Sequence, residues 1–87
     1  MTVQDTHTND EITTVVREFI ARLSGRPDIE DDRPLISGGV LDSLAAVQMV
    51  DFVERTFQVE VGYEDLELPN FDSVRGLAAL VTRRVAA

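Results

Sequence analysis

The ten residues ISGGVLDSLA, Ile36–Ala45, mark the point at which a glycine-containing loop turns into a helix. Gly38 and Gly39 allow the backbone to turn sharply, and Asp42 carries a carboxylate that suits the cap of a helix. The hydroxyl of Ser43 then falls in the first helical turn, where we expect it to be exposed. The free amides and the positive dipole end at such a position favour an attached anionic group.

The helix that follows Asp42 is predicted to have a core-facing side and an exposed side. Three- and four-residue spacing places on the core side Ala46, Met49, Val50, Val53 and Phe57. The other side carries a candidate partner-binding set: Leu44, Val47, Asp51, Glu54 and Arg55. An ordinary solvated helix face is the alternative interpretation of this second set.

Two further helices are predicted, one on each side of this one. Upstream, the capping-box spacing of Thr8–Glu11 precedes an apolar stripe, which predicts a helix over about Asp10–Leu23. Downstream, the stretch Asn70–Ser73 offers caps for a last helix that reaches Val85. Residues 1–9 are expected to form a flexible N-terminal tail.

The connections between these helices show no helical period. Residues 24–41 hold two prolines, three glycines and an acidic cluster, which predicts a long, packed loop. The apolar residues that would pin this loop to the helices are Ile29, Leu35, Ile36 and Val40. Residues 58–61 alternate in hydropathy, but a lone four-residue strand would lack a partner, so a packed connection is expected. One short helical turn is predicted within 62–68, ended by Pro69.

The predicted fold class is therefore all-α. Three main helices and one short helix would form a small up-and-down four-helix bundle, with the long loop between the first two main helices. A chain of 87 residues allows a single domain with one modest core.

Composition restricts what such a bundle can do. The formal net charge of −8 opposes binding to nucleic-acid phosphates and to anionic membranes. The chain has no cysteine and a single histidine, His7, so neither a thiolate metal site nor a Ser-His-acid triad is predicted, and no residue is assigned as catalytic or metal-binding. Without a membrane-length apolar run or a secretory signal, we expect a cytoplasmic protein, with a monomer as the default.

Local pattern alone does not decide what Ser43 does. An Asp-Ser pair before an apolar run is frequent at helix starts and is explained by capping. The same pattern recurs at Asp72-Ser73, where no glycine pair precedes it, and there we interpret it as a plain cap.

Together with the order of the predicted helices around it, the stretch Gly39–Leu44 resembles the acyl carrier and peptidyl carrier protein family. The resemblance includes the capped first helix, the Leu35-Ile36 pair in the loop, and Phe57 at the end of the second helix. It also includes the Phe71-x-Ser73-Val74 start of the last helix. Because it extends over about Asp10–Val85, residues 10–85 are expected to form one carrier protein domain.

This resemblance implies that Ser43 receives 4′-phosphopantetheine from coenzyme A through a phosphopantetheinyl transferase. The thiol of that arm would hold a building block as a thioester, and the chain itself would catalyse nothing. A loading enzyme, either an adenylating ligase or an acyltransferase, and a downstream synthase are the other implied partners. Their contacts are expected at Asp42 and on the partner-binding set of the second helix.

Departures from fatty-acid carriers suggest which cargo is carried. Ala45 and Gln48 stand where those carriers usually place acids on the recognition helix, and Arg55 stands where another acid is usual. These positions argue against productive exchange with fatty-acid synthase enzymes. Val40-Leu41 before Asp42 and Ala46-Val47-Gln48 after it instead resemble peptidyl, D-alanyl and other stand-alone carriers of amino acids or short acyl groups, which implies a role in polyketide or non-ribosomal peptide assembly. A fatty-acid carrier and a cofactor-free helical adaptor stay open as alternatives.

Overall fold

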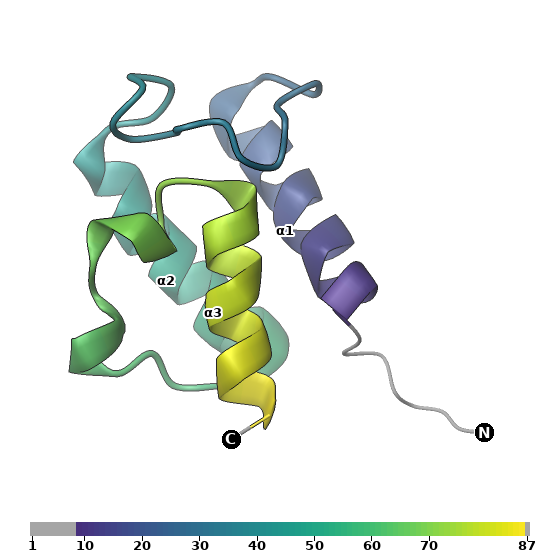
Figure 1. Ribbon diagram of the computed structural model, residues 1–87, viewed down its shortest axis with the longest axis vertical. Coiled ribbons are helices and arrows are strands. Elements are labelled where there is room, and N and C mark those ends of the chain that lie inside the picture. Colours follow the sequence, from purple (N-terminus) through teal and green to yellow (C-terminus); the bar gives the residue numbers. More distant parts are fainter. Residues whose placement is uncertain (1–8, 87) are drawn as a thin grey trace.

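The computed structural model describes residues 9–86, which form three α-helices and two short 3-10 helices (Figure 1). The α-helices are α1 (Asn9–Ser24), α2 (Ser43–Phe57) and α3 (Val74–Ala86). The 3-10 helices are η1 (Tyr63–Asp65) and η2 (Leu68–Asn70).

The chain passes up and down the molecule in the order that the sequence predicts. In Figure 1, α1 ascends, the long loop crosses the top, and α2 descends. The segment with η1 and η2 then returns to the top, and α3 descends beside α1. The described residues contain no strand, so 58–61 is a connection, and the all-α bundle is confirmed. No helix within residues 9–86 has the length and apolarity to span a membrane.

The core lies where the three α-helices meet, and the long loop contributes to it. Its buried apolar side chains are Ile12, Val16, Ile20, Leu35, Ala45, Met49, Val53, Phe57, Phe71, Val74, Leu77, Ala78, Leu80 and Val81. Leu35 is fully buried, and Ile29, Ile36 and Val40 pack partly buried against the core. The loop is therefore an ordered part of the core, as predicted.

The core-facing side of α2 is rotated slightly from the predicted one. The buried residues Ala45, Met49, Val53 and Phe57 follow one another at intervals of four, so their stripe begins at Ala45. Ala46, which was assigned to the core, is only partly buried. Ala45, which was not assigned to the core, is buried and only 5% exposed.

Two predicted boundaries also differ from the structure. Helix α1 begins at Asn9, one residue earlier than expected, and the rest of the expected tail, His7 included, lies outside the described residues. Pro69 does not end the short turn: it lies inside the second 3-10 helix, η2. Proline fits there because the first positions of a helix need no backbone N–H.

Candidate functional site

The site is built at the N-terminal end of α2. Asp42 is the N-cap residue, with extended backbone angles of φ −96° and ψ 177°, and its carboxylate accepts a hydrogen bond from the Ala45 amide at 3.2 Å. Ser43 is the first residue of the helix and is exposed, as predicted. The Asp42 carboxylate is thus occupied with the helix end, and the Ser43 hydroxyl is accessible to an approaching enzyme.

The loop before Ser43 is folded into a tight double turn. The amides of Val40 and Leu41 both donate to the carbonyl oxygen of Leu35, at 2.8 and 2.9 Å. Gly39 adopts a φ of +78°, which L-residues with a side chain rarely adopt. A Cβ on Gly38 would lie 2.4 Å from the carbonyl oxygen of Pro34, so this position has no room for a side chain. Both glycines are needed for the path that leads into α2.

Asp72, from the start of the last helix, holds this loop in place. Its carboxylate accepts the amides of Ile36 and Ser37, at 2.7 and 2.8 Å, and the hydroxyl of Ser37. Its carbonyl oxygen accepts the amide of Leu35 at 2.7 Å. Burial alone would raise the pKa of Asp72, but the hydrogen bonds from Ser37 and its neighbours outweigh burial and hold that pKa below its ordinary value.

The interpretation of Asp72-Ser73 as a plain cap is therefore correct only for the serine. The Ser73 hydroxyl accepts the amide of Gly76 at 2.9 Å and caps α3. Asp72 instead connects the start of α3 to the long loop, a role that no local signal in the sequence indicates because its partners lie about 35 residues away.

A shallow, largely apolar groove of about 260 Å³ begins at Ser43. One side is formed by Ser43, Ala46, Val47 and Val50 of α2, and the other by Leu66, Glu67, Leu68 and Phe71, with Ile36 at its margin. Val47, one of these lining residues, is 64% exposed, and Leu44, the residue after Ser43, is 67% exposed. Exposed apolar side chains gathered around a groove are typical of a site that binds a ligand or a partner.

The predicted partner-binding residues divide into two groups. Asp42, Leu44 and Val47 are exposed around Ser43 on the first turns of α2. Further along the helix, Arg55 forms an exposed ion pair with Asp51 at 3.1 Å.

Glu54 belongs to neither group, because it is half-buried rather than exposed as predicted. Its carboxylate accepts the amide of Val61 at 2.9 Å, which fastens the chain after α2 to the helix. Glu54 therefore has a structural role, and its contact with a partner stays a prediction.

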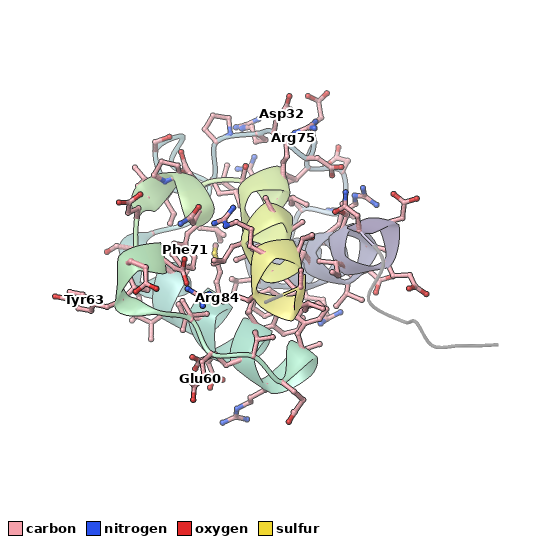
Figure 2. The ribbon with its side chains drawn as sticks, turned by 60° about the horizontal axis from the view of Figure 1, so that its bottom comes forward. Asp32, Glu60, Tyr63, Phe71, Arg75 and Arg84 are labelled. Atoms are coloured by element: carbon pink, nitrogen blue, oxygen red, sulfur yellow. The ribbon has the colours of Figure 1, made fainter. Side chains whose placement is uncertain are left out.

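Sequence reasoning missed the second side of the groove. Leu66 and Leu68 lie in a stretch too short for a periodic pattern, yet they are 52% and 50% exposed next to the groove. Tyr63 is 91% exposed and projects away from the molecule (Figure 2). Among residues 9–86, no cluster of His, Cys, Asp or Glu side chains is arranged to hold a metal ion.

Comparison with known proteins agrees with this geometry. Residues 14–81 match the family described as "Phosphopantetheine attachment site". The chain is also 32% identical over 62 residues to a "Probable acyl carrier protein PigG" from Serratia sp. (strain ATCC 39006), an overlap that covers 70% of this chain and 71% of that protein. The chain therefore belongs to the phosphopantetheine-binding carrier protein family, whose cofactor is 4′-phosphopantetheine.

Proposed function

We propose that Ser43 is the attachment site for the phosphopantetheine arm and that the protein presents a small acyl or aminoacyl group to partner enzymes. The observation that carries this proposal is an exposed serine hydroxyl at the first residue of α2, at one end of an apolar groove. Residues 10–85 would form the carrier domain.

The hydrogen bonds of the other serines support the choice of Ser43. The chain has four serines, all within the described residues. The hydroxyl of Ser24 accepts the amide of Arg26, that of Ser37 donates to Asp72, and that of Ser73 accepts the amide of Gly76. For Ser43 the structure describes no hydrogen bond of the hydroxyl to the protein, which leaves its oxygen available as a nucleophile.

The attachment step needs little from this chain beyond that hydroxyl. The Ser43 oxygen would form a bond to the β-phosphorus of coenzyme A, with 3′,5′-ADP as the leaving group and the serine proton passing to a base of the transferase. The phosphodiester then lies at the positive end of α2, which favours an anion by about 0.3–1 kcal/mol. When attached, the arm supplies a thiol that carries the cargo as a thioester.

The chain's own residues contribute binding and presentation rather than catalysis. Leu44 and Val47 would provide apolar contacts for the transferase and later partners, next to the attachment point. A tether at Ser43 raises the effective concentration of the cargo at a partner that is already bound to α2. The absence of cysteine leaves no side-chain thiol to capture the cargo by exchange.

Two observations support a small cargo for polyketide or non-ribosomal peptide assembly rather than a long fatty acyl chain. Val40-Leu41 before the cap and Ala46-Val47-Gln48 after it resemble the corresponding positions of carriers of amino acids or short acyl groups. Gln48 and Arg55 are both exposed on α2, where the resemblance to fatty-acid carriers would call for acids.

Mass spectrometry of the intact protein tests the attachment site. After incubation with coenzyme A and a promiscuous phosphopantetheinyl transferase, the protein should gain the mass of one phosphopantetheine, and Ser43→Ala should abolish the gain. Ser37→Ala, a matched serine just before the site, should still be modified. A gain that persists in Ser43→Ala would refute the site, and no gain in the unaltered protein would favour the cofactor-free adaptor.

The cargo is tested on the holo protein. Amino-acid-activating and short-acyl-activating enzymes should load the arm, as measured by a further mass increase. Efficient loading by a long-chain fatty-acyl ligase alone would instead support the fatty-acid carrier alternative.

A further inference from the structure

The connector, residues 61–70, forms one wall of the Ser43 groove but is poorly held by apolar burial. Leu66 and Leu68 of this connector line the groove and are half-exposed. The single buried side chain of the connector is that of Asp65, which is only 8% exposed. A buried carboxylate is strongly unfavourable unless charged or hydrogen-bonding groups compensate it.

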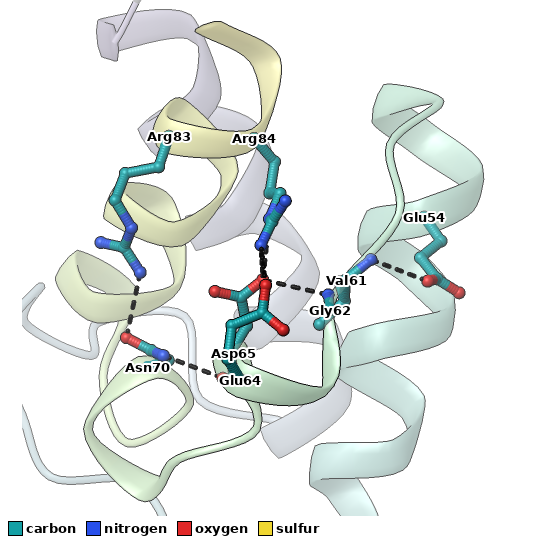
Figure 3. Close-up of polar contacts among 8 residues, drawn as sticks. All are labelled: Glu54, Val61, Gly62, Glu64, Asp65, Asn70, Arg83 and Arg84. Carbon is teal, nitrogen blue, oxygen red and sulfur yellow. Dashed lines mark hydrogen bonds and ion pairs between the residues drawn. The ribbon is translucent and has the colours of Figure 1, made fainter. Parts of the chain in front are cut away.

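Arg84, near the end of α3, supplies that compensation (Figure 3). Its Nε donates to Asp65 Oδ2 at 2.7 Å, and its Nη2 lies 2.6 Å from the same oxygen and 3.0 Å from Glu64 Oε2. The amide of Gly62 donates to Asp65 Oδ2 at 3.0 Å. Burial alone would raise the pKa of Asp65, but the hydrogen bonds from Gly62 and Arg84 outweigh burial and hold that pKa below its ordinary value.

A second set of polar contacts surrounds this pair. The side-chain amide of Asn70 donates to the carbonyl oxygen of Asp65 at 2.8 Å, and Arg83 Nη2 donates to Asn70 Oδ1 at 3.3 Å. Both arginines therefore reach from one turn of α3 to the connector, as Figure 3 shows. Of the two, Arg84 is the less exposed and makes the charge-assisted pair with Asp65.

We propose that Arg84 is a positioning residue for the groove beside Ser43 and that it acts through Asp65. Leu66 directly follows Asp65 in the chain, so a displacement of the carboxylate displaces the groove wall. Without Arg84, the carboxylate loses its charged partner and reaches water by swinging outward, which carries Leu66 away from α2. That the attached arm contacts this groove is part of the proposal and rests on the function proposed above, whereas the Arg84–Asp65 contact does not.

Solvent exchange of backbone amides in the apo protein, measured by NMR, tests this positioning role. Arg84→Gln should accelerate exchange by tenfold or more at Leu66 and Phe71, whose amides close the two 3-10 turns. The core amides of α2, such as that of Val53, should keep their exchange rates. The matched control is Arg55→Gln, which removes an exposed ion pair and should change neither set.

Two further variants distinguish a positioning role of Arg84 from a contribution to general stability. The double variant Asp65→Asn/Arg84→Gln buries no unpaired charge. The amide exchange rate of Leu66 should therefore return toward that of the unaltered protein. Arg84→Lys keeps the positive charge but loses the two-point contact. Its exchange rate at Leu66 should lie between those of the unaltered protein and Arg84→Gln. Uniform acceleration over the whole chain, or no change at Leu66, would overturn the proposal.

The link to the groove is tested by comparing apo and holo proteins. Attachment of the arm should shift the amide resonances of Leu66 and Leu68, and the shifts should be lost in Arg84→Gln although Ser43 is still modified. Equal shifts in both proteins would overturn the link. If the unaltered protein gains no phosphopantetheine, the proposed function fails, and the exchange measurement on the apo protein still decides the role of Arg84.

Discussion

The carboxylate of Asp72 binds both the amide and the hydroxyl of Ser37, although 35 residues separate the two in the sequence. This contact joins the start of α3 to the loop that leads into α2. Because the loop ends at Asp42, the position of Ser43 depends on a residue from the last third of the chain. The attachment site proposed here is therefore set by tertiary contacts as well as by its own helix cap.

Asp72→Ala should destabilise the protein by about 2 kcal/mol in the free energy of unfolding, because several donors then lose a charged acceptor. Chemical denaturation followed by circular dichroism measures the change. Asp32→Ala is the matched control in the same loop, since Asp32 is exposed, and should change stability by less than about 0.5 kcal/mol. Equal effects of the two substitutions would show that the loop does not depend on Asp72.

The stabilising effect of Asp72 should disappear in acid. Its folded-state pKa lies below the ordinary value, so the folded protein binds this proton more weakly than the unfolded chain does. The contribution is thus fully present above the unfolded pKa of about 3.9 and is lost as the pH falls through the folded pKa. The stability difference between the unaltered protein and Asp72→Asn should therefore shrink below about pH 4. A difference that grows in acid would contradict the assignment.

Gly76→Ala should destabilise the protein by about 1–2 kcal/mol, although alanine is the better helix former by about 1 kcal/mol. A Cβ at this position of α3 would lie 2.3 Å from the carbonyl oxygen of Pro69, so η2 would have to move. Thermal or chemical unfolding measures the effect. The control is Ala79→Gly at an exposed position of the same helix, which measures only the difference in helix propensity between alanine and glycine. If Gly76→Ala instead stabilises the protein, η2 can move to accommodate the added Cβ at little energetic cost.

Leu44→Ala should slow modification of Ser43 while leaving the fold intact. Leu44 is 67% exposed next to the attachment site, so its truncation should change stability by less than about 0.5 kcal/mol. Loss of an apolar partner contact should lower the kcat/KM of the transferase for the carrier by about tenfold. Thr56→Ala, exposed near the other end of α2, should have no effect on either quantity. Equal transferase kinetics for all three proteins would remove Leu44 from the proposed contact surface.

The predictions that succeeded rest on interactions between near neighbours in the chain. The cap at Asp42 involves a residue three positions later, and the helices were recognised from a period of three to four residues. The exposure of Ser43 follows from its place just after that cap. Such features can be predicted because the interacting groups are brought together by one turn of helix.

The predictions that failed depend on how elements pack. Ala45 and Ala46 are chemically identical, and only the rotation of α2 against its neighbours decides that the first is buried. The exposure expected for Glu54 was wrong because the chain after Phe57 folds back and presents the Val61 amide to it. Neither outcome has a signature within one turn of the residue concerned.

The amino-acid sequence by itself determined three amphipathic helices, a long pinned loop, and a serine at the leading end of the second helix. Only the tertiary structure decided that Asp72 holds the loop, that Arg84 reaches Asp65, and that the connector becomes the second wall of a groove beside Ser43. The physical reason is the distance in sequence between the interacting residues. Caps and periodicity act within a few residues, whereas charged pairs between distant segments form only after the apolar core has brought those segments together.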